Sequence, residues 1–133
     1  TFNPWVTLYQ PMLDFNLHWD YKTDVYSVTN RAPKAGEASH YEYIRNVARS
    51  RAMTLIALIN NSQGQGRVLL IEGTTMGTTY AAISFLTDDH LWGPVLAAAT
   101  NKNGRLGNFE VLLASDFVRG GVTNTQVVAF HQH

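Results

Sequence analysis

The stretch RVLLIEGTTMGTTYAAISFL, from Arg67 to Leu86, indicates how this chain is built. An apolar run ends at Glu72 and Gly73, a threonine-rich turn with a second glycine follows, and a helix-forming segment then begins. Strand, glycine turn and helix, in this order, form many nucleotide-binding and hydrolytic sites. The stretch therefore predicts an α/β architecture and raises the question of a site at the turn.

The turn matches neither of the common phosphate-binding patterns. Gly73 and Gly77 are separated by three residues instead of four, and Thr78 stands where the Walker pattern needs lysine. The dinucleotide fingerprint is absent. What remains is a helix N-terminus with threonine hydroxyls, which can hold a carboxylate or a phosphate. The candidate ligand-binding residues are Glu72, Gly73, Thr74, Thr75, Gly77, Thr78 and Thr79.

A structural role explains the same residues. Gly73 permits a tight turn, Gly77 permits close packing of helix on sheet, and the threonines cap the helix. Glu72 is an acid or base at the strand end, a solvated carboxylate, or a cap for a neighbouring loop. Structural roles of this kind are the commoner use of such residues, and both interpretations stay open at this point.

Outward from this stretch, the sequence predicts two hairpins joined by helices. Met53–Ile59 and the strand at Arg67–Gly73 form the first hairpin, and both are so apolar that layers must cover both of their faces. Helices are expected over 75–87 and from Asp88 or Asp89 to Ala99, with Gly93-Pro94 kinking or splitting the second. The strands FEVLLASDFV and TQVVAFHQ form the second hairpin through RGGVTN.

This order predicts a small Rossmann-like α/β sandwich. A helical crossover links Val68–Ile71 to Val111–Ala114, so these strands are expected to be parallel neighbours at the centre of a mixed sheet. Helices would pack on that sheet.

The N-terminal third is predicted in less regular pieces. Asn3 caps a helix over 4–13, and Asp24–Asn30 forms a strand that a loop at Arg31–Ala38 follows. Ser39 and Glu42 match the capping-box pattern, which predicts a short helix over HYEYIRNVAR, residues 40–49.

Composition limits the function classes. The chain has 133 residues, 45% of them hydrophobic and 15% charged, which predicts a single globular domain over 1–133. Ten basic and ten acidic residues cancel, so this fragment is expected not to bind nucleic acid. No apolar run reaches the roughly 20 residues of a membrane span. The chain starts at Thr1 without a signal segment and is interpreted as a fragment of a longer protein, with any anchor upstream.

Isolated chemical groups do not add up to a catalytic or metal site. His131 and His133 would share one face of a strand, but two ligands without a third make a weak metal site. The pair His18 and Asp20 and the set Ser115, Asp116 and His131 carry no motif of acyl transfer. Arg45, Arg49 and Arg51 are expected on a solvated helix face. No catalytic residue, metal or cofactor is predicted.

The C-terminal half resembles a known type of domain. LIALINNSQGQGRVLLIEGTTMGTTYAAISFLTD, followed by FEVLLASDFVRGGVTNTQVVAFH, is similar to an uncharacterised domain at the C-terminus of some bacterial winged-helix transcriptional regulators. The opening NPWVTLYQPML also matches, whereas a strand–helix unit of longer members is missing. The resemblance implies a DNA-binding head upstream, often with a membrane helix between. The chain would then lie at the extracytoplasmic end of a membrane-anchored protein, or otherwise in the cytoplasm.

Three functions follow as hypotheses. The first is a sensory or interaction domain of a transcriptional regulator, which binds a small molecule or protein partner near Gly73–Thr79. The second is a hydrolase or transferase with its site at the same turn. The third is a dimerisation domain, because the strand Thr125–Gln132 has no lysine or proline to protect it at a sheet edge. A homodimer is expected in the first case as well, since winged-helix heads read paired half-sites.

Overall fold

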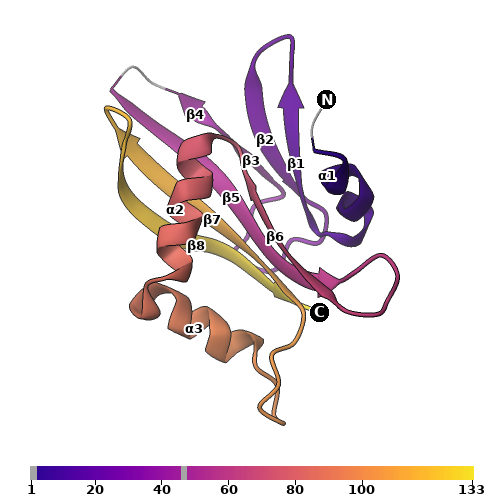
Figure 1. The fold of residues 1–133 in the computed structure, drawn as a ribbon. Helices are drawn as coiled ribbons and strands as arrows, with labels where there is room; N and C mark the ends of the chain where they lie inside the picture. The colour runs from indigo at the N-terminus through magenta and orange to yellow at the C-terminus, as the bar shows by residue number, and fades with distance from the viewer. Residues whose placement is uncertain (1–2, 46–47) are drawn as a thin grey trace.

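The computed structural model describes residues 3–45 and 48–133 (Figure 1). One helix and a 3-10 turn precede the first strand, and two further helices follow the sixth strand. The elements are α1 (Pro4–Tyr9), η1 (Gln10–Met12), β1 (Phe15–Asp20), β2 (Val25–Asn30), β3 (His40–Glu42), β4 (Ile44–Arg45), β5 (Arg49–Asn60), β6 (Arg67–Gly73), α2 (Met76–Leu86), α3 (Asp89–Ala99), β7 (Phe109–Val118) and β8 (Gly121–Gln132). No helix in the described ranges combines the length and the hydropathy that crossing a bilayer requires.

The predicted Rossmann-like α/β sandwich is wrong, because the protein is mostly β and every strand pair is antiparallel. Strands account for 47% of the structure and helices for 24%. The central sheet runs in the order β4, β5, β7, β8, and β6 pairs with β5 beside β4. β1, β2 and β3 form a separate small sheet.

The prediction was wrong about which strands are adjacent in the central sheet. Val68–Ile71 of β6 and Val111–Ala114 of β7 run in the same direction, as a crossover requires, but β5 lies between them and pairs with both. The right-handed crossover rule concerns strands in one sheet and does not require that they touch. β5, at twelve residues, is long enough to pair with both strands, so the crossover passes over it.

Both predicted hairpins are confirmed. β5 and β6 pair from Asn60 with Arg67 to Thr54 with Gly73. β7 and β8 turn at Arg119 and Gly120, which both have positive φ, as a tight hairpin turn requires.

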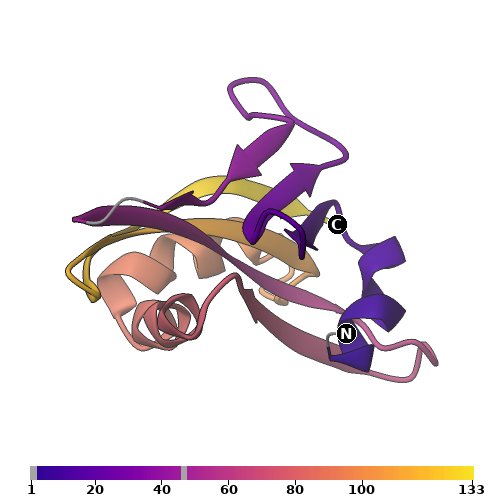
Figure 2. The same ribbon diagram turned by 90° about the horizontal axis from the view of Figure 1, so that it is seen from above.

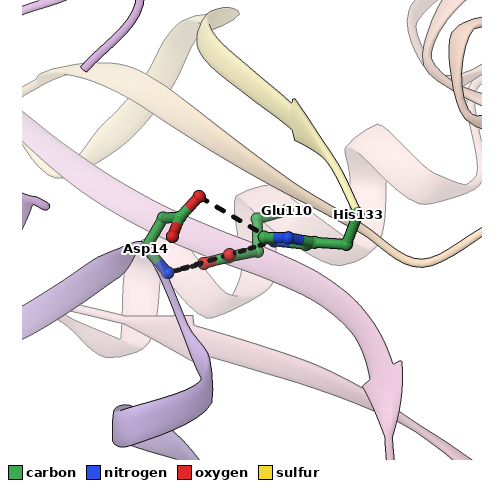
Figure 3. A group of neighbouring side chains, drawn as sticks. All are labelled: Asp14, Glu110 and His133. Carbon is green, nitrogen blue, oxygen red and sulfur yellow. Dashed lines mark hydrogen bonds and ion pairs between the residues drawn. The ribbon is translucent and has the colours of Figure 1, made fainter. Parts of the chain in front are cut away.

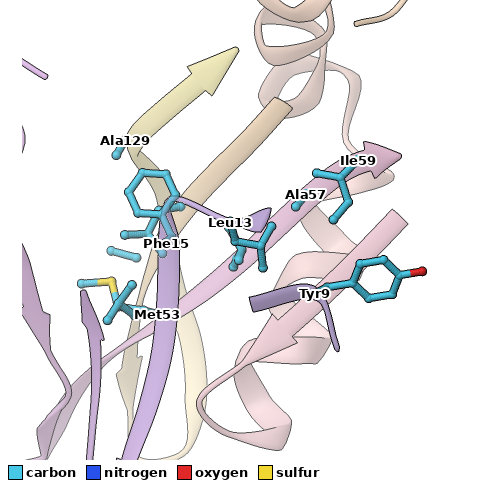
Figure 4. Close-up of a cluster of buried hydrophobic side chains, with 11 residues drawn as sticks. Tyr9, Leu13, Phe15, Met53, Ala57, Ile59 and Ala129 are labelled. Atoms are coloured by element: carbon cyan, nitrogen blue, oxygen red, sulfur yellow. The ribbon is translucent and has the colours of Figure 1, made fainter. Parts of the chain in front are cut away.

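The central sheet is covered on both faces, as its apolar strands predicted (Figure 2). α2 and α3 pack on one face, where Ile56 and Phe85 belong to one buried cluster. The small sheet and the Tyr9 side chain cover the other face, where Leu55, Ala57 and Phe15 are buried together (Figure 4). Neighbouring residues of β5 thus serve opposite cores, which explains why the strand is apolar throughout.

The helix predictions were correct for the caps and less accurate for the lengths. Asn3 accepts a hydrogen bond from the Trp5 N–H, but α1 ends at Tyr9 and a 3-10 turn containing Pro11 follows. Asp88 caps α3, which continues through Pro94 without a break.

The helix predicted over 40–49 is wrong where the structure describes it. Residues 40–42 form β3, 44–45 form β4 and Arg49 begins β5, while residues 46 and 47 lie outside the described part. The small sheet overrides the local capping signal, because Ser27 and Thr29 in β2 pair with Glu42 and His40. β1 was not predicted, although Phe15, Leu17 and Trp19 alternate as in a half-buried strand.

Candidate functional site

A pocket of about 320 Å³ opens where α1, the small sheet and the end of β6 meet. Its size is at the lower end of the range for small-molecule sites. The lining residues are Asn3, Val6, Thr7, Gln10, Leu17, His18, Trp19, Tyr26, Ile71, Glu72, Gly73, Thr74 and Thr79. The predicted candidates Glu72, Gly73, Thr74 and Thr79 are among them, whereas Thr75, Gly77 and Thr78 are not.

Glu72 is the unusual group in this pocket. Its register partner in β5 is Leu55, a core residue, so the alternation of β6 directs Glu72 toward the buried side of the sheet. Only 9% of the residue is exposed, and neither carboxylate oxygen has a hydrogen-bond partner or contact with water. Burial, together with the charge of Glu110, raises the pKa of Glu72 to about 7.

An unpartnered buried carboxylate is costly for the fold. Buried charges in proteins are normally paired and hydrogen-bonded, because desolvation otherwise costs several kcal/mol. Glu72 is the only described residue with buried side-chain oxygens that lack any partner. Such a group is a candidate for a functional site. The solvated carboxylate that the sequence allowed as an alternative is therefore wrong.

Two aromatic side chains form the opposite wall of the pocket. Trp19 in β1 and Tyr26 in β2 are register partners, and their rings stack at 6.0 Å between centroids with 17° between planes. The indole N–H of Trp19 donates to Asp24, 3.0 Å away. This bond fixes the ring orientation, so the wall has a defined shape.

The glycine-threonine turn serves the fold. Thr75 and Thr78 form a reciprocal capping box: each side-chain oxygen accepts the backbone N–H of the other. A Cβ on Gly73 would lie 2.5 Å from the Thr78 hydroxyl oxygen, and one on Gly77 would lie 2.9 Å from the Phe117 ring. Caps and close packing, the structural alternative, therefore account for Thr75, Gly77 and Thr78.

Three backbone donors of the turn are already used. The Thr74 N–H donates to the Met53 carbonyl, and the N–H groups of Thr75 and Thr78 are used in the capping box. A phosphate or carboxylate that used any of these three donors would have to break its bond. Thr79 and Thr74 line the pocket, but beside a carboxylate they do not make an anion site.

A second cluster of charged groups lies on the same face of the central sheet (Figure 3). Glu110 in β7 is fully buried and accepts hydrogen bonds from the Asp14 N–H with both oxygens, at 2.9 and 3.0 Å, and from the Phe15 N–H at 3.1 Å. His133 Nε2 is 2.6 Å from Glu110 Oε2. Glu110 thus fastens the start of β1 to the central sheet.

His131 continues this cluster toward the loop between β2 and β3. The ring is 2% exposed, with Nδ1 2.7 Å from Asp14 Oδ2 and Nε2 2.7 Å from Glu37 Oε2. An ionised carboxylate only accepts, so each contact is a hydrogen bond when the facing ring nitrogen carries a proton. Burial raises the pKa of Glu37, but hydrogen bonds from His131, the Lys34 N–H and Asn30 outweigh it and lower the pKa to about 2.

The cluster supplies what the sequence lacked for a metal site at His131 and His133, namely a third ligand. His131 Nδ1 and His133 Nε2 lie 2.7 and 4.0 Å from Asp14 Oδ2, and Asp14 and Glu110 are possible further ligands that the sequence did not reveal. Ligand atoms of Asp14, Glu110 and His133 lie within 4.8 Å of one another. Each of these groups also has a hydrogen-bond partner in the protein.

The other sequence candidates are not brought into a site. Ser115 hydrogen-bonds Thr125, whereas His131 is in register with Glu110, so no Ser–His pair forms. Arg51 lies 4.0 Å from Asp116 on the strands β5 and β7, and not on the expected helix face. Arg45 is in β4 and Arg49 begins β5.

The small sheet brought residues into the site that sequence reasoning missed. Gln10, Leu17, Trp19 and Tyr26 were not among the predicted site residues, yet all line the pocket. The alternation Phe15, Leu17, Trp19 was the signal that could have revealed β1. Compared with known proteins, this chain matches no family model, no curated protein and no solved structure.

Proposed function

We propose that this chain is a sensory domain that binds a small molecule in the pocket between α1, the small sheet and β6. The observation that carries the proposal is Glu72, a buried carboxylate without any hydrogen-bond partner at the wall of that pocket. A protein that keeps such a group pays for it in stability, and a ligand that supplies the missing partner recovers the loss.

The wider context follows from the resemblance to C-terminal domains of bacterial winged-helix regulators. In that context, ligand binding would change the arrangement of the two chains in a homodimer. The spacing of their two DNA-binding heads would change with it. A homodimer that does not itself bind DNA is part of this proposal. The sequence upstream of Thr1 tests the context: it should encode a winged-helix head, with or without an apolar stretch of about 20 residues.

An enzyme is the alternative. A carboxyl whose pKa is about 7 suits a general acid or base, and Glu72 would be that group in a hydrolase or transferase. His18 also lines the pocket, and no serine or cysteine is among the described lining residues. The lack of a serine or cysteine nucleophile favours binding over catalysis.

A thermal-shift screen of a small-molecule library tests the proposal, because a ligand specific to the native state raises the Tm. The Thr7→Trp variant fills the pocket from the exposed side of α1, and Leu8→Trp adds the same bulk next to it, on a residue that does not line the pocket. Compounds that shift the wild type and Leu8→Trp, but not Thr7→Trp, support the proposal. Shifts that persist in Thr7→Trp contradict it, and turnover of a hit would identify the enzyme.

A further inference from the structure

The charges of the pocket are one-sided. Within the described part of the chain, Glu72 is the only carboxylate that lines it, no lysine or arginine does, and His18 is its one imidazole. None of the ion pairs among the described residues involves Glu72. Glu110 adds negative charge behind Glu72. A cation entering the pocket is therefore attracted, and an anion is repelled.

The rest of the wall suits an apolar body. Val6, Leu17 and Ile71 contribute aliphatic surface, and the stacked Trp19 and Tyr26 contribute aromatic rings. Aromatic faces attract organic cations, and tryptophan does so most strongly. A hydrated metal ion gains nothing from such a wall, whereas an alkyl or aryl ammonium ion gains from both parts.

The carboxylate is able to meet such a ligand. Its oxygens are shielded from water, but no hydrogen bond holds them there. A change of side-chain rotamer toward the pocket therefore breaks no hydrogen bond. An ammonium group then supplies the donors that the protein lacks.

We propose that the pocket binds a small organic ammonium ion, with its charged nitrogen on Glu72 and its apolar body against Trp19 and Tyr26. This inference rests on the proposed function and names its ligand class. Binding takes the ionised form of Glu72, so a protein that holds a proton there releases it as the complex forms.

Three probes of similar shape test the ligand class by isothermal titration calorimetry: 2-phenylethylammonium, 2-phenylethanol and phenylacetate. The ammonium ion is expected to bind at least tenfold more tightly than the alcohol, and phenylacetate is expected not to bind. Glu72→Gln should weaken the ammonium ion at least tenfold, whereas Glu42→Gln, an exposed carboxylate in β3, should leave it unchanged. Titration near pH 6 in buffers of different ionisation enthalpy should show proton release in the wild type and none in Glu72→Gln.

The outcomes separate this inference from the proposed function. Equal binding of alcohol and ammonium ion, or binding that survives Glu72→Gln, overturns the ligand class. Absence of binding by the ammonium probe at low millimolar concentration overturns it too. In each case the library screen with Thr7→Trp and Leu8→Trp still decides whether the pocket binds a small molecule of another class.

Discussion

Glu72 and Glu110 lie on the same face of the central sheet, on the two strands that flank β5. Glu72 is in register with Leu55, and Glu110 with Ala57, two core residues of one buried cluster. The two carboxylates differ in what surrounds them: Glu110 accepts backbone and histidine hydrogen bonds, whereas Glu72 accepts none. One is therefore built into the fold by hydrogen bonds, and the other is the group that our proposal assigns to a ligand.

The pH dependence of folding stability should reveal the raised pKa of Glu72. Its pKa is raised from 4.5 to about 7 in the folded protein, so the native state binds more protons than the unfolded state between these values. The contribution of this group to the free energy of unfolding is therefore favourable below pH 4.5. It is lost as the pH rises to about 7, and the total loss is up to about 3 kcal/mol. Urea unfolding of wild type and Glu72→Gln across this range measures the difference. A constant difference would show that Glu72 keeps an ordinary pKa.

Glu37 should show the opposite pH dependence. Its folded pKa is lowered to about 2, so its stabilising contact with His131 is complete above pH 4.5 and is lost as pH falls toward 2. After allowance for solvent screening, the expected loss is about 1 kcal/mol. Unfolding of Glu37→Gln between pH 2 and 5, against Glu42→Gln as an exposed control, measures it. Parallel curves for Glu37→Gln and wild type would contradict the expectation.

Removal of Glu110 should detach the small sheet from the central one. Glu110→Ala leaves the Asp14 and Phe15 N–H groups and His133 without their acceptor, at an expected cost of about 3–5 kcal/mol. Glu110→Gln keeps one acceptor and should cost less. Hydrogen exchange of β1 amides, compared with those of β7, locates the effect. Equal stability of wild type and Glu110→Ala would contradict the role of this residue.

Glycine substitutions should separate crowded from open positions. Gly73→Ala places a Cβ 2.9 Å from the backbone nitrogen of Thr79, which the first turn of α2 cannot relieve without moving, so we expect a loss of roughly 2 kcal/mol or more. Gly93→Ala, in α3, meets no atom within 4 Å and should stabilise by about 0.5–1 kcal/mol. Chemical unfolding of both variants checks the contrast. A tolerated Gly73→Ala would show that the turn has room.

Self-association should depend on β8. This strand pairs only with β7, so its other side is an edge of the central sheet, and Val127 is 41% exposed on it. The domain should dimerise, and Val127→Lys should shift it to monomer, whereas Val25→Lys, on the small sheet, should not. Sedimentation equilibrium over a wide concentration range measures both. A monomeric wild type at high micromolar concentration would exclude the dimer.

The sequence by itself determined the features that depend on near neighbours. Two hairpins, the caps Asn3 and Asp88, capping of the second helix by threonine, and the need for a layer on each face of the apolar strands could all be predicted. Hairpin turns and caps involve atoms a few residues apart, so local chemistry is sufficient to specify them.

Only the tertiary structure decided which strands are neighbours and which polar groups meet. An apolar strand pairs equally well with several others, and the sequence did not show that β5 would lie between β6 and β7. The contact of His131 with Asp14 joins residues 117 positions apart, and the small sheet that brings Trp19 to the pocket replaces a predicted helix. Glu72 could be picked out in the sequence, but its lack of a partner could not. Whether a carboxylate is solvated, paired or left alone depends on every chain segment that packs around it, and these segments come from the whole chain.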